Sequence, residues 1–352
     1  MSRYLLEEKL GQGNVGVVYR AIDQQSGQSI AVKVLNSRFT PKMAETTKAF
    51  GDVGRATELG SPHLMPTLGI GEHAERHAFF VEPLLANASL GQRLEGNGPL
   101  PPAQAVQVAL EVIAGLKALH GASLLHMDLK PANLFLIRDP LGMERAVLGG
   151  VGMHHLHRLE AAPTKADGEC LARPEYLAPE IASGKPLDAQ TDVYLTGVLL
   201  YEMLTGRPPF TGGNFKTIAR RHALEKPVSP QLVRPEARIG DPLSAVVMRC
   251  LEKKPDRRYP TAAELSEALQ AVALPDGSRS LKTTTMTPSP AKAVESDEDA
   301  AAKKAEEAAA AKKAEEAAAA KKAEEAAAAK KAEEAAAAKR AEEAAAAKKK
   351  AD

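Results

Sequence analysis

The sequence has little of what marks a secreted, a membrane-spanning or a nucleic-acid-binding protein. It has only two cysteines, Cys170 and Cys250, which argues against a disulfide framework and favours a reducing compartment. The charges nearly cancel, at a net +1, so neither nucleic acid nor an anionic membrane is an expected partner. The N-terminal residues MSRYLLEEKL contain no apolar signal core, and the longest apolar stretch, residues 193–204, includes Tyr, Thr and Glu and indicates a buried helix. We therefore expect a cytoplasmic protein without a membrane segment.

Composition separates the C-terminal part of the chain from the rest. Residues 301–350 contain only Ala, Lys, Glu and one Arg, and the unit AAAAKKAEE recurs every nine residues. These residues are strong helix formers, but successive units face opposite sides of a helix and leave no continuous apolar seam for a coiled coil. The repeat predicts a single solvated helix of roughly 75 Å, with a frayed low-complexity tail as the alternative. Residues 276–300 are rich in Ser, Thr, Pro and acidic residues, which predicts a disordered linker.

Residues 1–275 have the mixed composition of a domain with a sizeable core. Short runs of β-branched and aliphatic residues predict strands, and apolar residues at helical spacing predict helices. The predicted strands are 4–10, 15–22, 29–35 and 77–82, and the predicted helices are 42–59, 102–120, 191–204 and 262–272. Because the strands come first and most helices follow, we expect an α+β chain with a sheet lobe over about 1–84 and a larger helical lobe over about 85–275.

A glycine-rich turn lies between the first two predicted strands. Residues 11–18 are GQGNVGVV, and Gly11, Gly13 and Gly16 lack the Cβ atoms that would keep backbone N–H groups away from phosphates. Taken alone, the motif also suits an ordinary hairpin turn. The sequence AVK follows at residues 31–33 in the third predicted strand, and the combination predicts a nucleotide-phosphate site.

A second motif, HMDLKPAN, lies at residues 126–133. An Asp, a Lys and an Asn at these offsets are typical of the catalytic loop of protein kinases. With the glycine-rich turn and residues 31–33, the chain resembles the bacterial eukaryotic-like serine/threonine protein kinases over about residues 4–272. The resemblance implies a bilobal protein-kinase-like fold.

The resemblance also implies roles for individual residues. Lys33 would contact the α- and β-phosphates of ATP. In the catalytic loop Asp128 would be the base, Lys130 would steady the transferred phosphate and Asn133 would bind magnesium. The other implied nucleotide contacts are Val18 and Ala31 over the adenine, Val81 as gatekeeper, the hinge backbone of Glu82 and Leu84, and Phe135 as the pocket floor.

The chain departs from the family where a metal-binding Asp-Phe-Gly is expected. Residues 150–152 are Gly-Val-Gly, so Gly150 offers no carboxylate to magnesium and Val151 removes an aromatic ring from the interior. Phosphoryl transfer depends on positioning and charge neutralisation, and losing one such group can cost several kcal/mol, or about 10³-fold in rate. The last glycine of the motif, Gly152, is kept.

Three other positions differ from the family pattern. Met127 replaces the Arg that pairs with a phosphate on the activation segment, so activation of that kind is not expected. Arg173 replaces a Thr beside the catalytic Asp and could itself pair with Asp128. The helix glutamate that pairs with Lys33 aligns near Asp52, which is one methylene shorter, and two glutamates of the same helix, Glu45 and Glu58, are out of register. In contrast, residues that support the fold are kept: Asp192, which would tie down the catalytic loop, and Glu180, which could pair with Arg258.

Three histidines lie close together, His154, His155 and His157. Their spacing matches no strong zinc signature, and the two cysteines lie elsewhere. We interpret them as part of a solvated activation segment, with a metal site as the alternative.

These observations lead to three functional hypotheses. The first is a pseudokinase: a signalling or scaffold protein that binds protein partners, such as another kinase or its substrate, with ATP as a candidate cofactor and Mg²⁺ as a doubtful one. The second is a weakly active or metal-atypical serine/threonine kinase that holds magnesium with Asn133 and a neighbouring acid, Glu144 or Glu160. The third is a phosphoacceptor or adaptor whose linker is modified at Thr283, Thr284, Thr285, Thr287 or Ser289.

Overall fold

A computed structural model describes most of the first 272 residues. The described ranges are 3–13, 15–37, 39, 44–72, 77–85, 89–138, 144–157 and 174–272. By its internal contacts the chain divides into two units, Met1–Thr283 and Thr284–Asp352. The predicted linker and repeat helix lie outside the described residues, so both stay predictions.

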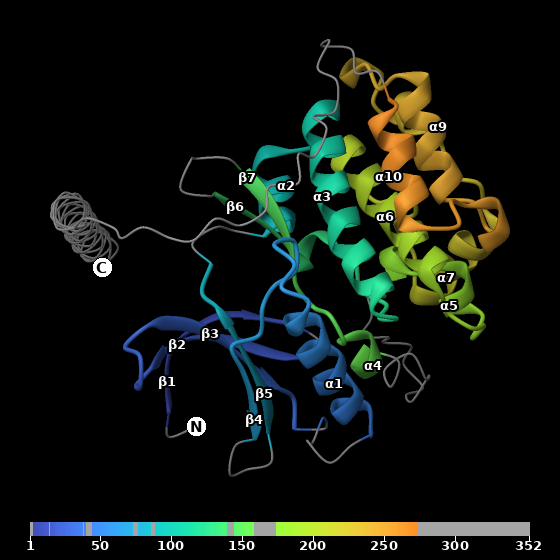
Figure 1. Ribbon diagram of the computed structural model, residues 1–352. Coiled ribbons are helices and arrows are strands. Elements are labelled where there is room, and N and C mark those ends of the chain that lie inside the picture. The colour runs from blue at the N-terminus through green and yellow to red at the C-terminus, as the bar shows by residue number, and fades with distance from the viewer. Residues whose placement is uncertain are drawn as a thin grey trace, which may run out of the picture. The chain divides into compact units, whose positions relative to one another are not determined.

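The first lobe is a five-stranded antiparallel sheet with one helix beside it (Figure 1). The strand order is β1-β2-β3-β5-β4. Its elements are β1 (Tyr4–Gln12), β2 (Gly16–Asp23), β3 (Ser29–Leu35), α1 (Ala44–Glu58), β4 (Gly69–Glu72) and β5 (Ala78–Pro83). All strands predicted here are present, and β4 is an additional one. Its sequence, GIGE, contains two glycines, which is why no strand pattern is visible there.

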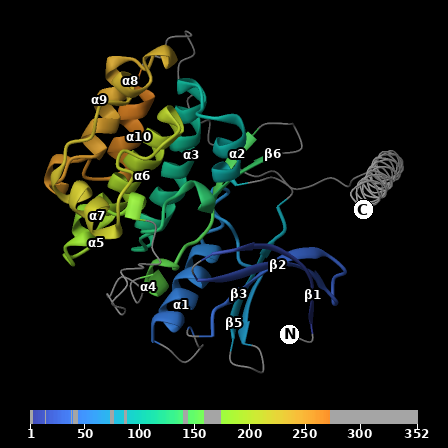
Figure 2. The same ribbon diagram turned by 180° about the vertical axis from the view of Figure 1, so that it is seen from behind.

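The second lobe is mostly helical (Figure 2). Its elements are α2 (Leu90–Asn97), α3 (Pro102–Gly121), the hairpin β6 (Leu134–Arg138) and β7 (Glu144–Leu148), α4 (His154–His157), α5 (Pro179–Ala182), α6 (Ala189–Thr205), α7 (Phe215–Leu224), α8 (Pro230–Val233), α9 (Asp241–Cys250) and α10 (Ala262–Gln270). Across the described ranges, no helix has the length and apolar composition needed to cross a bilayer.

The core of the second lobe forms around α6. This helix is buried on nearly every side, as expected for a helix that is apolar all round. It starts where Asp188 accepts a hydrogen bond from the N–H of Gln190 (2.9 Å) and ends at Gly206, whose φ of +80° suits glycine. This buried central helix carries Asp192 to the catalytic loop.

Candidate functional site

The catalytic loop is fastened to α6 by one buried carboxylate. Asp192 accepts hydrogen bonds from the N–H groups of His126 (2.9 Å) and Met127 (2.7 Å), and from Nε2 of His120 (2.9 Å). Burial alone would raise the pKa of Asp192, but these donors outweigh it and lower the pKa below its usual value. The predicted anchoring role of Asp192 is confirmed.

His126 links the same loop to the end of β7. Its ring is fully buried, its Nε2 donates to the carbonyl of Gly149 (3.1 Å), and its Nδ1 accepts from the N–H of Asp128 (3.2 Å). Burial lowers the pKa of His126, so the imidazole is neutral, which matches one donating and one accepting nitrogen. The position of Asp128 therefore depends on the strand that leads into Gly150.

Asp128, Lys130 and Asn133 lie together, as their spacing predicts. Lys130 Nζ donates to both carboxylate oxygens of Asp128 (2.7 and 2.9 Å). Asn133 Nδ2 donates to the carbonyl of Asp128 (2.9 Å) and to its Oδ2 (2.7 Å). The three side chains thus satisfy one another within the loop through charge-assisted hydrogen bonds.

The position expected to carry the metal-binding carboxylate is filled from the side by Asn133. Gly150 has a φ of +85°, and a Cβ atom built there would lie 2.7 Å from Nδ2 and 2.9 Å from Cγ of Asn133. The amide NH2 group does not ligate cations, so Asn133 has only its Oδ1 to offer, and its Nδ2 is held by Asp128. Magnesium prefers several oxygen ligands, including carboxylates, and the described residues at this point do not supply the set.

Glu144 and Glu160 are the acids predicted as alternative magnesium ligands, and Glu144 does not lie beside Asn133. Glu144 pairs with Arg138 at the far end of the β6–β7 hairpin, four residues along the strand from Leu148, and so roughly 13 Å from the catalytic end. It also accepts a hydrogen bond from Gln104 Nε2 (3.3 Å). Glu144 is therefore too far from the catalytic loop to hold magnesium there, and its predicted role as a metal ligand is wrong. Glu160 lies outside the described residues.

Gly152 is kept because its backbone touches α1. Its φ is +76°, and a Cβ there would lie 2.7 Å from the carbonyl oxygen of Ala49 in α1. Val151 beside it is buried in the core of the helical lobe, whereas Met153 belongs to the core of the sheet lobe with Phe80. The Gly-Val-Gly segment therefore still joins the two lobes, although it offers no acid.

The three glycines of the glycine-rich turn have different surroundings. A Cβ at Gly16 would lie 2.1 Å from the carbonyl oxygen of Val34, whereas Gly11 and Gly13 have nothing within 4 Å. The next residue back, Val15, is buried, and its carbonyl accepts from the N–H of Asn36 (2.9 Å). Gly16 is thus needed for packing on β3, and only Gly11 and Gly13 leave open space of the kind that a phosphate needs.

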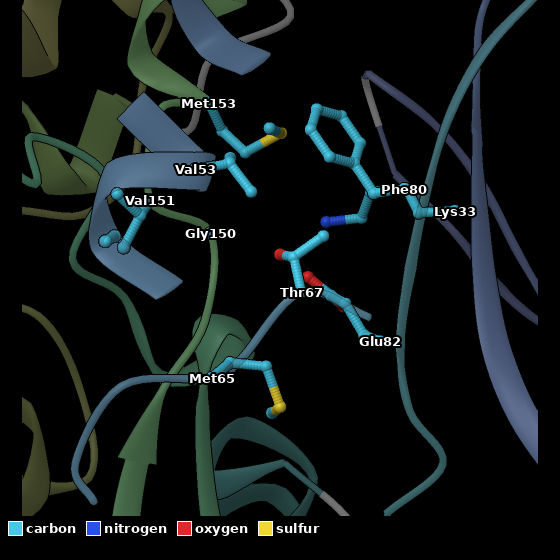
Figure 3. A pocket seen from close by; sticks show the side chains of 10 residues that line it. Lys33, Val53, Met65, Thr67, Phe80, Glu82, Gly150, Val151 and Met153 are labelled. Atoms are coloured by element: carbon cyan, nitrogen blue, oxygen red, sulfur yellow. The ribbon is translucent and has the colours of Figure 1, made fainter. Parts of the chain in front are cut away.

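A narrow pocket lies between β3, β5, α1 and residues 150–153 (Figure 3). Its lining combines Lys33 and Glu82 with Phe80, Met65 and Met153. In Figure 3 the side chains of Lys33 and Glu82 point into this space. The large apolar side chains leave room for about one water molecule.

The prediction that Val81 is the gatekeeper is wrong, because its side chain lies on the sheet face opposite to that of Lys33. Strand pairing places Lys33 opposite Phe80 and Ala31 opposite Glu82. Side chains alternate along a strand, so Phe80 and Glu82 share the face of Lys33, while Val81 packs on the other face with Val32. The sequence analysis missed Phe80 and the Glu82 side chain, because the β3–β5 register that puts them on the face of Lys33 is not visible in the sequence.

Lys33 does not form the ion pair with an acidic residue of α1 that the family resemblance implies. Asp52 lies on α1, but its Oδ2 contacts Nε2 of His155 in α4 at 2.8 Å. Within the described part of the chain, Lys33 has no ion pair, with Asp52 or with Glu45 and Glu58.

The remaining nucleotide-site residues lie on the elements around the pocket. Val18 pairs with Lys33 across β2 and β3, and Ala31 is buried. Phe135 is on β6, with its ring 3.4 Å from the place a Cβ on Gly149 would occupy. Leu84 follows β5 directly. Arg173 lies outside the described residues, so its pairing with Asp128 stays a prediction.

A buried ion pair confirms the second scaffold prediction. Arg258 donates to both carboxylate oxygens of Glu180, at 2.7 and 2.9 Å, and neither side chain is more than 4 % exposed. The guanidinium also donates to the backbone carbonyls of Gln190 (2.9 Å) and Glu252 (2.8 Å). The pair thereby joins α5 to the start of α6 and to the segment after α9.

Comparison with known proteins places the chain in a family. The protein kinase domain model matches residues 4–270, and the chain belongs to this family. It is 33% identical over 283 residues to the serine/threonine-protein kinase PkaA of Streptomyces coelicolor, covering 77% of this chain and 50% of that protein. It is 31% identical to PknB of Mycobacterium leprae, covering 75% of this chain and 42% of that protein. The chain therefore spans half or less of the length of these relatives.

Solved structures share the fold. The kinase domain of PknI from Mycobacterium tuberculosis has a TM-score of 0.58 at 21% identity, over 76% of this chain and 95% of that one. Rad53 residues 1–466 in complex with AMP-PNP has a TM-score of 0.62 at 20% identity, over 76% and 64% of the two chains. The predicted kinase fold and the eukaryotic-like serine/threonine kinase family are confirmed. The family in general uses ATP and Mg²⁺.

Proposed function

We propose that this chain is a pseudokinase, a protein-kinase-like module that acts by binding and transfers phosphate poorly or not at all. The observation that carries the proposal is the absence of a carboxylate at Gly150, together with the Asn133 amide that lies against it. Without that acid, the charge on the transferring phosphate lacks its main metal support. Asp128 then serves the loop itself, through its bonds with Lys130 and Asn133.

Nucleotide binding without efficient chemistry is part of the same proposal. The open space at Gly11 and Gly13 and the cation of Lys33 favour phosphate binding, while the missing acid disfavours Mg²⁺. The proposal includes a scaffold role toward protein partners, for example another kinase or its substrate. The phosphoacceptor role of the linker is compatible with this function.

A weakly active serine/threonine kinase is the second candidate. The observation in its favour is that Asp128, Lys130 and Asn133 are retained and hydrogen-bonded to one another. A base and a phosphate-steadying lysine could still support slow transfer.

Nucleotide binding and phosphate transfer, measured together, separate the two candidates. We expect ATP binding by the purified chain to be the same with Mg²⁺ and with EDTA, and to be weakened by Lys33→Met. We expect transfer of label from γ-labelled ATP, to the chain itself or to a generic acceptor, to be indistinguishable between wild type and Asp128→Asn. Transfer that requires Asp128, increases with Mg²⁺ and is first order in enzyme would establish an active kinase instead.

Restoring the family acid by Gly150→Asp should not restore activity. Residue 150 has a left-handed backbone, which costs a non-glycine residue about 1–2 kcal/mol, and the new Cβ must displace Asn133. Gly150→Ala is the matched control, because it introduces the same Cβ without the carboxylate. We expect both variants to be destabilised and neither to transfer phosphate at a rate above wild type. Full kinase activity in Gly150→Asp alone would contradict this expectation and show that the missing carboxylate is the one defect of the site.

A further inference from the structure

Three metal-ligating side chains converge between α1 and α4, apart from the catalytic loop. Asp52 comes from α1, and His154 and His155 come from α4. One ligand atom from each residue lies within 4.8 Å of the other two. Both views of the fold show α4 beside α1 (Figures 1 and 2). Asp52 lies about one hundred positions before the two histidines in the sequence, so no spacing motif in the histidine segment could reveal it.

The side chains already contact one another. His155 Nε2 donates to Asp52 Oδ2 at 2.8 Å, and both side chains are only 21% exposed. The rings of His154 and His155 lie with their centroids 3.9 Å apart. The Nδ1 atom of His154 is buried and has no hydrogen-bond partner among the described residues. His154 thus has one buried nitrogen without a partner in the described part of the chain, and its ring lies beside a second imidazole and a carboxylate, both of them zinc-ligand types.

Backbone packing holds this cluster in place. Gly152 approaches Ala49 of α1 so closely that a Cβ would not fit. Met153 and Leu156, on either side of the two histidines, are buried in the sheet-lobe core with Val53 of α1. The ligands therefore come from two elements that are fixed to each other.

We propose that Asp52, His154 and His155 form a binding site for a divalent transition-metal ion, with Zn²⁺ the best match to the donor set. Two imidazoles and one carboxylate with an open fourth position are an established zinc arrangement. Tetrahedral ligands at about 2.0–2.1 Å from zinc lie about 3.4 Å apart, so side-chain rotation must close at most about 1.4 Å. The metal replaces the proton that His155 Nε2 donates to Asp52, and this proton is released to solvent.

A bound ion would fasten α1 to the segment after Gly150. Asp52 would then be committed to the metal and unable to pair with Lys33. The site would be structural or regulatory, and none of its three ligands belongs to the catalytic loop or to the glycine-rich turn.

Zinc titration of the metal-free full-length chain, in the absence of nucleotide, tests the site. The protein is stripped with EDTA, dialysed and titrated with Zn²⁺, and then with Co²⁺, whose absorption spectrum reports the ligand geometry. We expect one ion per chain and a tetrahedral or five-coordinate cobalt spectrum. Asp52→Asn and His154→Gln, on different elements, should each weaken binding at least ~100-fold, since loss of even an outer partner of a ligand costs about 10–100-fold. His77→Gln, a histidine outside the cluster, is the control.

Circular dichroism and thermal unfolding of each variant verify that it is folded. Absence of stoichiometric binding by wild type would overturn the proposal and leave a plain His155–Asp52 ion pair. Unchanged binding in both folded ligand variants would overturn it equally. Neither result bears on phosphate transfer, so this proposal and the pseudokinase proposal fail independently.

Discussion

At the scale of single residues, the catalytic loop has a structural reason to persist without catalysis. Asp128 receives two hydrogen bonds from Lys130 and two from Asn133. Replacing any of the three would leave a part-buried polar group with fewer partners, at a cost of about 1–3 kcal/mol. The motif can therefore persist because it stabilises the loop as well as because it catalyses a reaction. The missing acid at Gly150 favours the first explanation.

The glycine-rich turn yields a residue-scale prediction. Gly16→Ala should destabilise the chain by about 1–3 kcal/mol, because its Cβ would meet the β3 backbone at Val34. Gly13→Ala has open space and should be neutral or slightly stabilising, by about 0.4–1 kcal/mol. Urea unfolding followed by circular dichroism measures both. Equal destabilisation by the two substitutions would contradict the assignment of different roles to these glycines.

At the scale of elements, the long regular segments were predictable and the pocket face was not. The helix at 102–120 and the strand at 29–35 appear as α3 and β3, because their apolar periodicity is undisturbed. The orientation of Val81, in contrast, depends on which β5 residue pairs with Lys33. A shift of one residue turns every side chain to the opposite face, and only the β3–β5 register decides it.

The Glu180–Arg258 pair yields an element-scale prediction. Glu180→Gln should cost about 3–5 kcal/mol at pH 7, because it leaves the buried Arg258 charge without its counter-ion. Glu236→Gln, in an exposed pair with Arg234, is the control and should change stability by less than about 0.5 kcal/mol. Urea unfolding of both variants is the measurement. An equal and small effect of the two would show that the buried pair contributes little.

The same pair predicts a pH dependence. Burial alone would raise the pKa of Glu180, but the hydrogen bonds and charge of Arg258 outweigh it, so the pKa in the fold lies below its ordinary value. A lowered folded pKa means that the stability from the pair is complete above the unfolded pKa and is lost as the pH falls through the folded one. The difference between wild type and Glu180→Gln should therefore shrink below about pH 4.

At the scale of the whole molecule, the two contact units yield a truncation prediction. A chain ending at Thr283, the boundary of the first unit, should unfold with the same midpoint as the full chain, since the two lobes contain the described core. The full chain should show additional helical circular dichroism that fades gradually on heating, because an isolated helix has no tertiary packing to make its melting cooperative. A lowered midpoint in the truncated chain would show that the repeat supports the kinase-like unit.

The sequence by itself determined the family, the order of the elements and the missing acid at Gly150, because these depend on residue identity and on local periodicity. Tertiary structure alone decided that Asn133 fills the space beside Gly150, that Glu82 rather than Val81 faces Lys33, and that Asp52 meets His155. Each of these depends on contacts between segments distant in the chain, or on strand register. Side-chain pairing across such distances is set by how the elements pack, and a single sequence does not show it.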